Sequence, residues 1–213
     1  TKTGQKITGT GLDGAFLDMP AFGPAGLHLA YVDHGNTHDL AVFAYDEAAN
    51  KVSSPQGLVP AGADPMLNAI CFPSVSPTVQ ATENTTSTWI VYHRGQYPNS
   101  LDTRFGPGDL YLASIDTPGV EVRLGAADGD GYPFAAGARD LHYNYEPTFD
   151  PQVAGGYMWV VFTSRRTYGN RLVGDSTMTK QLWVTAIDLL PQAGTDPSHP
   201  AFHVPGQDMA TLN

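Results

Sequence analysis

The chain is poor in cysteine, in positive charge and in long apolar runs. Cys71 is the single cysteine among 213 residues, so a disulfide framework or a four-cysteine zinc site within the chain is excluded. The 11 basic residues are outnumbered by 21 acidic ones and form no basic run, so the field of the chain repels nucleic acid and we expect no nucleic-acid partner. No apolar run approaches the roughly 20 residues of a membrane-spanning helix, so we expect no membrane span.

Motifs for common catalytic chemistry are also missing. The sequence contains no Gly-x-Ser-x-Gly nucleophile elbow and no glycine-rich phosphate loop. Its composition is nevertheless that of a folded protein, because 41% of the residues are hydrophobic and 15% are charged. Glycine and proline are abundant, at 23 and 17 residues, which is typical of many short strands joined by tight turns.

A two-part pattern occurs three times along the chain. Its first part has prolines at both ends and Phe or Val at the centre, and a β-rich apolar run follows each copy. Its second part begins with Asp-Leu or Gln-Leu and ends with Asp. The first parts are residues 20–24, 73–77 and 147–151, and the second parts are residues 39–46, 109–116 and 181–188.

The repeat predicts an all-β fold. Each copy supplies three strands, and a weaker run such as residues 120–124 supplies a fourth, so we expect a β-propeller of four-stranded antiparallel blades. About three blades are visible, which is too few to close a ring, so we interpret the chain as part of a larger ring. The expected divisions are an N-terminal segment (1–14), three blade repeats (15–66, 67–140 and 141–190) and a linker toward a further blade (191–213).

Parts of the repeat resemble the TolB-type, or WD40-like, propeller family. The run Gln181-Leu182-Trp183-Val184 and the pair Ser164-Arg165 are similar to segments of that repeat. The turn departs from the family, because Pro24-Ala25-Gly26 stands where the family has Pro-Asp-Gly. The resemblance implies a propeller fold and leaves the function open, because propellers host many functions.

The alignment of the repeats makes a prediction about burial. Phe22, Val75 and Phe149 occupy equivalent positions in the first part, and Leu40, Leu110 and Leu182 do so in the second. We expect all six side chains to be buried. Because a terminal blade lacks one neighbour, we also expect the surfaces near residues 16–22 and 183–202 to contact further polypeptide.

Two long insertions are the expected binding loops. Residues 95–108 and 167–180 interrupt equivalent positions of two repeats and should project from the same face of the scaffold, where binding residues usually lie. The candidate binding residues are Tyr97, Asp102, Arg104, Tyr168 and Arg171.

Carboxylates supply the remaining candidates. Asp128 and Asp130 alternate with glycines as in the start of a calcium loop, so calcium is the one cofactor considered, although a plain surface turn fits the same residues. Asp18 and Glu146 are expected near the central channel, where a carboxylate pair can act as acid and base in glycoside hydrolysis. We regard them as weak catalytic candidates, because their presence is all that the sequence shows.

The sequence favours a non-enzymatic binding or scaffolding propeller outside the cytoplasm, either by itself or as a subunit or fragment of a larger surface assembly. The polar residues 1–11 lack an initiator methionine, which we interpret as a processed start of a periplasmic, cell-surface or secreted protein. The expected partner is another protein or the remaining blades. The alternative is an enzyme, either a propeller glycoside hydrolase or the propeller domain of a larger hydrolase.

Overall fold

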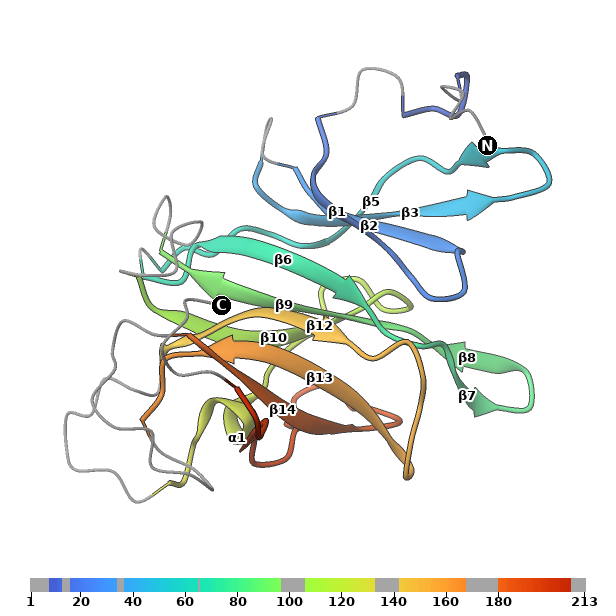
Figure 1. Cartoon of the computed structure of the whole chain (residues 1–213). Coiled ribbons are helices and arrows are strands. Elements are labelled where there is room, and N and C mark those ends of the chain that lie inside the picture. Colours follow the sequence, from blue (N-terminus) through green and yellow to red (C-terminus); the bar gives the residue numbers. More distant parts are fainter. Residues whose placement is uncertain are drawn as a thin grey trace.

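The regular secondary structure of the described residues is almost all antiparallel β-sheet (Figure 1). The computed structural model describes residues 8–12, 16–33, 37–64, 66–96, 106–132, 142–167 and 180–207. Within these ranges, α1 (Gly125–Asp128) is the one α-helix. No helix of the described residues combines the length and apolar character needed to cross a membrane. The all-β prediction is therefore confirmed.

Three sheets follow one another along the chain. The first contains β1 (Asp18–Phe22), β2 (His28–Val32), β3 (Leu40–Asp46), β4 (Lys51–Val52) and β5 (Gln56–Val59), with β4 and β5 both paired to β3. The second contains, in spatial order, β6 (Ala69–Val75), β9 (Trp89–Gly95), β10 (Gly108–Ser114) and β11 (Glu121–Arg123). The third contains β12 (Asn144–Phe149), β13 (Tyr157–Ser164), β14 (Gln181–Asp188) and β15 (Phe202–His203). A separate hairpin is formed by β7 (Val79–Thr82) and β8 (Thr85–Ser87).

The fourth strands agree only in part with the sequence. The run at residues 120–124 does contain β11, as expected. In the third repeat, however, the fourth strand is β15, which lies in the segment 191–213 that we had interpreted as a linker. The tail of the chain thus contributes to the third sheet, because β14 has a free edge on which a short extended segment can pair.

The first strand of each sheet carries the same irregularity. In β1, β6 and β12 the pairing register shifts, so that two residues face one on the neighbouring strand. This is a β-bulge, in which the extra residue is left out of the ladder of hydrogen bonds. The first proline of each repeat, Pro20, Pro73 or Pro147, lies in the bulge, where its missing N–H costs no ladder bond.

The three sheets are stacked face to face, with the second in the middle (Figure 1). One apolar cluster joins side chains of the first and second sheets, and another joins the second and third. The strands β1, β6 and β12 run next to one another through the stack. Among the described residues the stack does not close into a ring.

Each sheet has two faces, which we name from the chain order. The preceding face points toward the sheet that comes earlier in the chain, and the following face points toward the one that comes later. Val75 belongs to the cluster with the first sheet and Phe149 to the cluster with the second, so the central residue of the motif lies on the preceding face. Leu40 and Leu110 lie on the following face by the same criterion.

The burial prediction is correct for four of the six residues and wrong for two. Phe22 is 61% exposed and Leu182 is half-buried, whereas Val75, Phe149, Leu40 and Leu110 are buried. The strand pairing agrees with the alignment of the repeats. Phe22, Val75 and Phe149 each form the second residue pair after the bulge of their strand. The cause is position in the stack. In the described ranges, no sheet precedes the first one on the side of Phe22, and none follows the third on the side of Leu182.

The two ends of the stack are finished differently. On the preceding face of the first sheet, Leu29, Tyr31, Ala41 and Phe43 are buried beneath residues that include Leu12 of the N-terminal segment and Leu17, which directly precedes β1. The Val52 amide also donates a hydrogen bond to the Thr10 carbonyl oxygen, at 2.9 Å. Leu12 and Leu17 therefore cover part of this face, whereas Phe16 and Phe22 are exposed.

Leu110 and Leu182 offer a matched pair of substitutions. Leu110→Ala should lower the free energy of unfolding by about 2–5 kcal/mol, because it opens a cavity between two sheets. Leu182→Ala should cost roughly 1 kcal/mol, since that side chain is already partly exposed to solvent. Urea denaturation of the 213-residue chain measures both values. Equal losses would contradict the assignment of Leu182 to an uncovered face.

Candidate functional site

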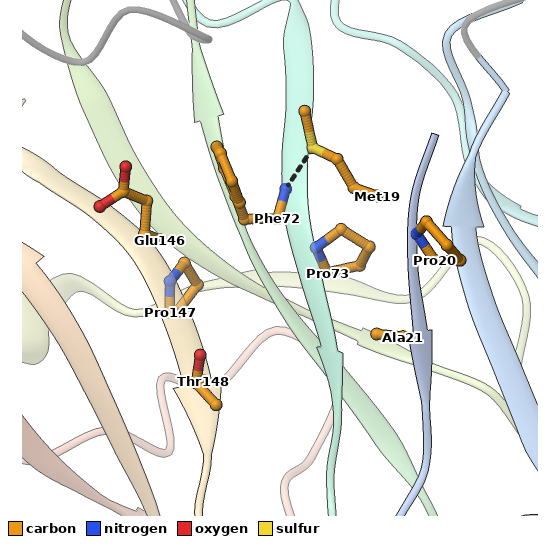
Figure 2. A pocket seen from close by; sticks show the side chains of 8 residues that line it. All are labelled: Met19, Pro20, Ala21, Phe72, Pro73, Glu146, Pro147 and Thr148. Carbon is orange, nitrogen blue, oxygen red and sulfur yellow. Dashed lines mark hydrogen bonds between the residues drawn. The ribbon is translucent and has the colours of Figure 1, made fainter. Parts of the chain in front are cut away.

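The three bulges meet around one pocket, shown in Figure 2. The pocket has a volume of about 360 Å³ and is open to solvent. Each of the three sheets contributes residues from its first strand. They are Met19, Pro20, Ala21, Phe72, Pro73, Glu146, Pro147 and Thr148. We call this the bulge pocket.

Met19, Phe72 and Glu146 hold equivalent places, each directly before the proline of its bulge. Their φ angles are 51°, 54° and 53°, in the left-handed region that non-glycine residues rarely adopt. A residue in such a conformation costs on the order of 1–3 kcal/mol and persists only where its surroundings impose it. In Figure 2 the three side chains point to the same side of their strands. The bulge thus turns one side chain of each sheet toward a common space.

The bulges also connect neighbouring sheets through backbone amides that the ladder leaves unused. The Phe72 N–H points to Sδ of Met19 in the first sheet, at 3.0 Å, drawn as the dashed line in Figure 2. The Glu146 N–H points to Nδ1 of His93 in the second sheet, at 3.2 Å. The Met19 N–H has no earlier sheet to reach and bonds to Oδ1 of Asp18 beside it, at 3.0 Å. Each buried or half-buried donor is thereby satisfied.

The pocket is mainly apolar and carries one carboxylate. Phe72 stacks on the His93 ring, with centroids 5.6 Å apart and an interplanar angle of 19°, which fixes the phenyl ring as a wall. The Glu146 carboxylate is bound at both oxygens, by Lys180 Nζ at 2.7 Å and by the Thr163 hydroxyl at 2.8 Å. Lys180 balances the charge, so the pocket offers apolar contact together with a neutralised ion pair.

The catalytic candidates are only partly brought together. Glu146 lines the bulge pocket. Asp18 directly precedes the lining residue Met19 in β1, and its carboxylate accepts a hydrogen bond from the Met19 backbone amide. Among the described residues that line the pocket, Glu146 is the sole carboxylate. Met19 and Phe72 were missed by the sequence analysis. Their signal was available, because each precedes the first proline of the repeated motif.

The candidate binding residues of the long loops are not described. Tyr97, Asp102, Arg104, Tyr168 and Arg171 all lie outside the described residues, so their role stays a prediction.

A second group of polar side chains lies between the second and third sheets. Arg123 contacts three carboxylates, Asp109 and Asp128 at 3.2 Å each and Asp130 at 2.7 Å. Asp128 is fully buried and also accepts hydrogen bonds from the Leu110 amide, at 3.2 Å, and from the side chain of Asn144, at 2.9 Å. These contacts tie α1 to β10 and β12, and we call the group the Arg123 cluster.

The Arg123 cluster bears on the calcium prediction. Asp128 and Asp130 do share a cation, but that cation is the guanidinium of Arg123. The described residues include no group of three or more His, Cys, Asp or Glu side chains placed to hold a metal ion. Calcium binding by these two aspartates stays a prediction.

Two titrating groups of this cluster are shifted in the same direction for different reasons. Burial, reinforced by nearby Asp109, raises the pKa of Asp128 well above its ordinary value, although Arg123 acts in the opposite sense. The pKa of His142 is also raised, chiefly by its hydrogen bond to Asp109 at 2.9 Å, with burial opposing. Both shifts favour the protonated form.

His142 gives a measurable pH dependence. Its folded-state pKa lies above 6.5, so the stability it contributes is present below pH 6.5 and is lost as the pH rises through the folded-state value. Titration of the His142 ring resonances by NMR should show this raised pKa. Asp109→Asn should lower it, because the neutral amide no longer favours the imidazolium. A pKa unaffected by Asp109→Asn would contradict the assignment.

The calcium prediction can be tested on thermal stability. With Arg123 already bound to both aspartates, addition of calcium or of a chelator should leave the melting temperature of the chain unchanged. Arg123→Gln should lower the melting temperature, because it removes the guanidinium that contacts Asp109, Asp128 and Asp130. A calcium-dependent rise in the unsubstituted chain would show instead that a metal ion competes with Arg123.

Comparisons of this chain with protein-family models, with curated proteins and with solved structures found no match. The similarity to TolB-type repeats therefore stays a prediction from the sequence. The geometry of the described residues is what supports a function.

Proposed function

We propose that the protein is a non-enzymatic β-propeller module that acts outside the cytoplasm and binds or scaffolds a protein partner at the bulge pocket. The observation that carries the proposal is the convergence of three equivalent, conformationally strained positions on one open pocket. Residues held in rare backbone conformations gather at ligand-binding sites more often than elsewhere. Here the same strain recurs in three sheets and serves one pocket.

The propeller assignment is supported by how the sheets repeat. Each has four or more antiparallel strands arranged in chain order, with the β7–β8 hairpin inserted in the second sheet, and the first strand lies next to the first strand of the neighbouring sheet. Stacked sheets of this kind, arranged around their first strands, are the building plan of a propeller. Location outside the cytoplasm is part of the proposal and depends on the sequence alone.

The chemistry of the pocket favours binding over catalysis. Its walls are a phenyl ring, a thioether and three prolines, which suit an apolar side chain of a partner polypeptide. The neighbouring Lys180–Glu146 pair can accept or donate hydrogen bonds at the rim of such a contact. Glycoside hydrolysis, the alternative function, requires two carboxylates about 5–10 Å apart. The described lining of the pocket supplies Glu146 alone.

Peptide selection with an NMR readout tests the proposal. A random peptide library is selected on the chain, and bound peptides are then added to protein labelled at its methionine methyl groups. We expect apolar peptides to shift the Met19 resonance and to lose affinity at least about tenfold on Phe72→Ala, because the aromatic wall is removed. Tyr132→Ala is the matched control, since Tyr132 is exposed and does not line the pocket.

Two outcomes would count against this function. Peptides that bind Phe72→Ala as tightly as the original chain would place the binding site elsewhere. Hydrolysis of chromogenic glycosides that is lost on Glu146→Gln would favour the hydrolase instead.

A further inference from the structure

In the described part of the chain, the third sheet is covered on one face only. Along β13 and β14, buried residues alternate with half-buried ones up to the exposed Asp188 at the end of β14, as in a sheet with a single neighbour. Every residue of β9 is buried, and so is every residue of β10 except Tyr111, because the second sheet has neighbours on both faces. The uncovered following face of the third sheet is lined by apolar side chains, namely Tyr157, Trp159, Val161, Leu182, Val184 and Ala186.

The same positions are fully buried in the second sheet. The strand registers make Trp159 the equivalent of Trp89, and Val184 the equivalent of Leu112. Trp89 is 4% exposed and Leu112 is 0% exposed, because the third sheet packs on them. The third sheet therefore carries a row of apolar side chains at the positions that, in the second sheet, are covered by the sheet that follows. Phe202 of β15, at 41% exposed, extends this row.

The chain leaves the third sheet as it leaves the second. After β11, the Leu124 amide donates to the Leu110 carbonyl oxygen at 2.8 Å, and Asp128 accepts from the Leu110 amide. After β15, the Val204 amide donates to the Leu182 carbonyl oxygen at 3.0 Å, and Gln207 accepts from the Leu182 amide at 2.6 Å. In the second sheet this connection leads to β12, the first strand of the next sheet.

A second copy of this chain would meet an obstacle at that face. To follow the third sheet in the same way, it would have to present the preceding face of its first sheet. The side chains there, Leu29, Tyr31, Ala41 and Phe43, are already buried with Leu12, Leu17 and Val52. Self-association in this arrangement would have to displace Leu12 and Leu17.

We propose that the following face of the third sheet is the docking surface for a fourth sheet of the same repeat, formed by the polypeptide that continues past Gln207. That sheet presents an apolar preceding face, with a large side chain against Trp159 and Val184 as Phe162 and Trp183 stand against the second sheet. Its first strand runs beside β12 and adds a further wall to the bulge pocket. The inference stands on the sheets themselves and does not require the bulge pocket to bind a partner.

Cysteine labelling of the natural full-length protein and of residues 1–213 tests the proposal. Val184→Cys is placed on the uncovered face, and Leu112→Cys is its equivalent on a covered face. Ala49→Cys is the control for an exposed site. The native Cys71 is buried and contributes little labelling.

We expect Val184→Cys to react at least about tenfold more slowly in the full-length protein than in residues 1–213, because a packed sheet excludes the reagent. Leu112→Cys should be protected in both chains, and Ala49→Cys should react rapidly in both. Ala186→Cys on the same face provides a second reading if Val184→Cys does not fold.

Three results would overturn the proposal. One is a natural protein that has no polypeptide beyond this chain. Another is equal labelling of Val184→Cys in the two proteins. The third is labelling in residues 1–213 that slows as protein concentration rises, which would make a second copy the occupant.

Discussion

The bulge on each first strand is the constraint on which the arrangement of the three sheets depends. It removes one amide from the ladder of its own sheet, and a half-buried amide must find an acceptor. In the second and third sheets that acceptor belongs to the preceding sheet, Met19 for Phe72 and His93 for Glu146. The first strands are thereby brought next to one another, and the residue before each proline is turned into the shared pocket.

Burial then determines what each sheet looks like in sequence. A sheet with two neighbours needs apolar residues on both faces, so β9 is apolar over consecutive positions rather than at alternate ones. The third sheet has the same kind of residues but only one neighbour among the described residues. The apolar side chains on its following face therefore stay partly exposed. The composition of a strand therefore reports how many sheets it is suited to contact.

The sequence predicted the repeated strands well, because proline and the Asp-Leu or Gln-Leu starts recur at equivalent places. It could not predict which copies of an equivalent residue are exposed. Phe22 and Phe149 are the same residue type at the same register position, and only their place in the stack separates them. The exposure of a residue at such a position depends on whether another sheet packs on it. The pattern of residues within one strand does not carry that information.

The candidate site was predicted less well. Glu146 was identified as a channel carboxylate, but its partner Lys180 lies 34 residues away in the sequence and has no local signal. Arg123 is similar, because it joins three aspartates from different elements and no spacing rule connects them. Met19 and Phe72 do not look functional as residue types. Their role comes from the left-handed backbone conformation that each adopts directly before a proline.

The contact of Leu12 and Leu17 with the first sheet makes the two outer faces of the stack unequal. Both leucines come before the strands that they cover, so this contact can form as soon as the first sheet has been synthesised. The following face of each sheet depends instead on polypeptide that is synthesised later. Completion of the sheets in chain order would therefore leave the following face of the newest sheet as the main apolar surface still to be covered.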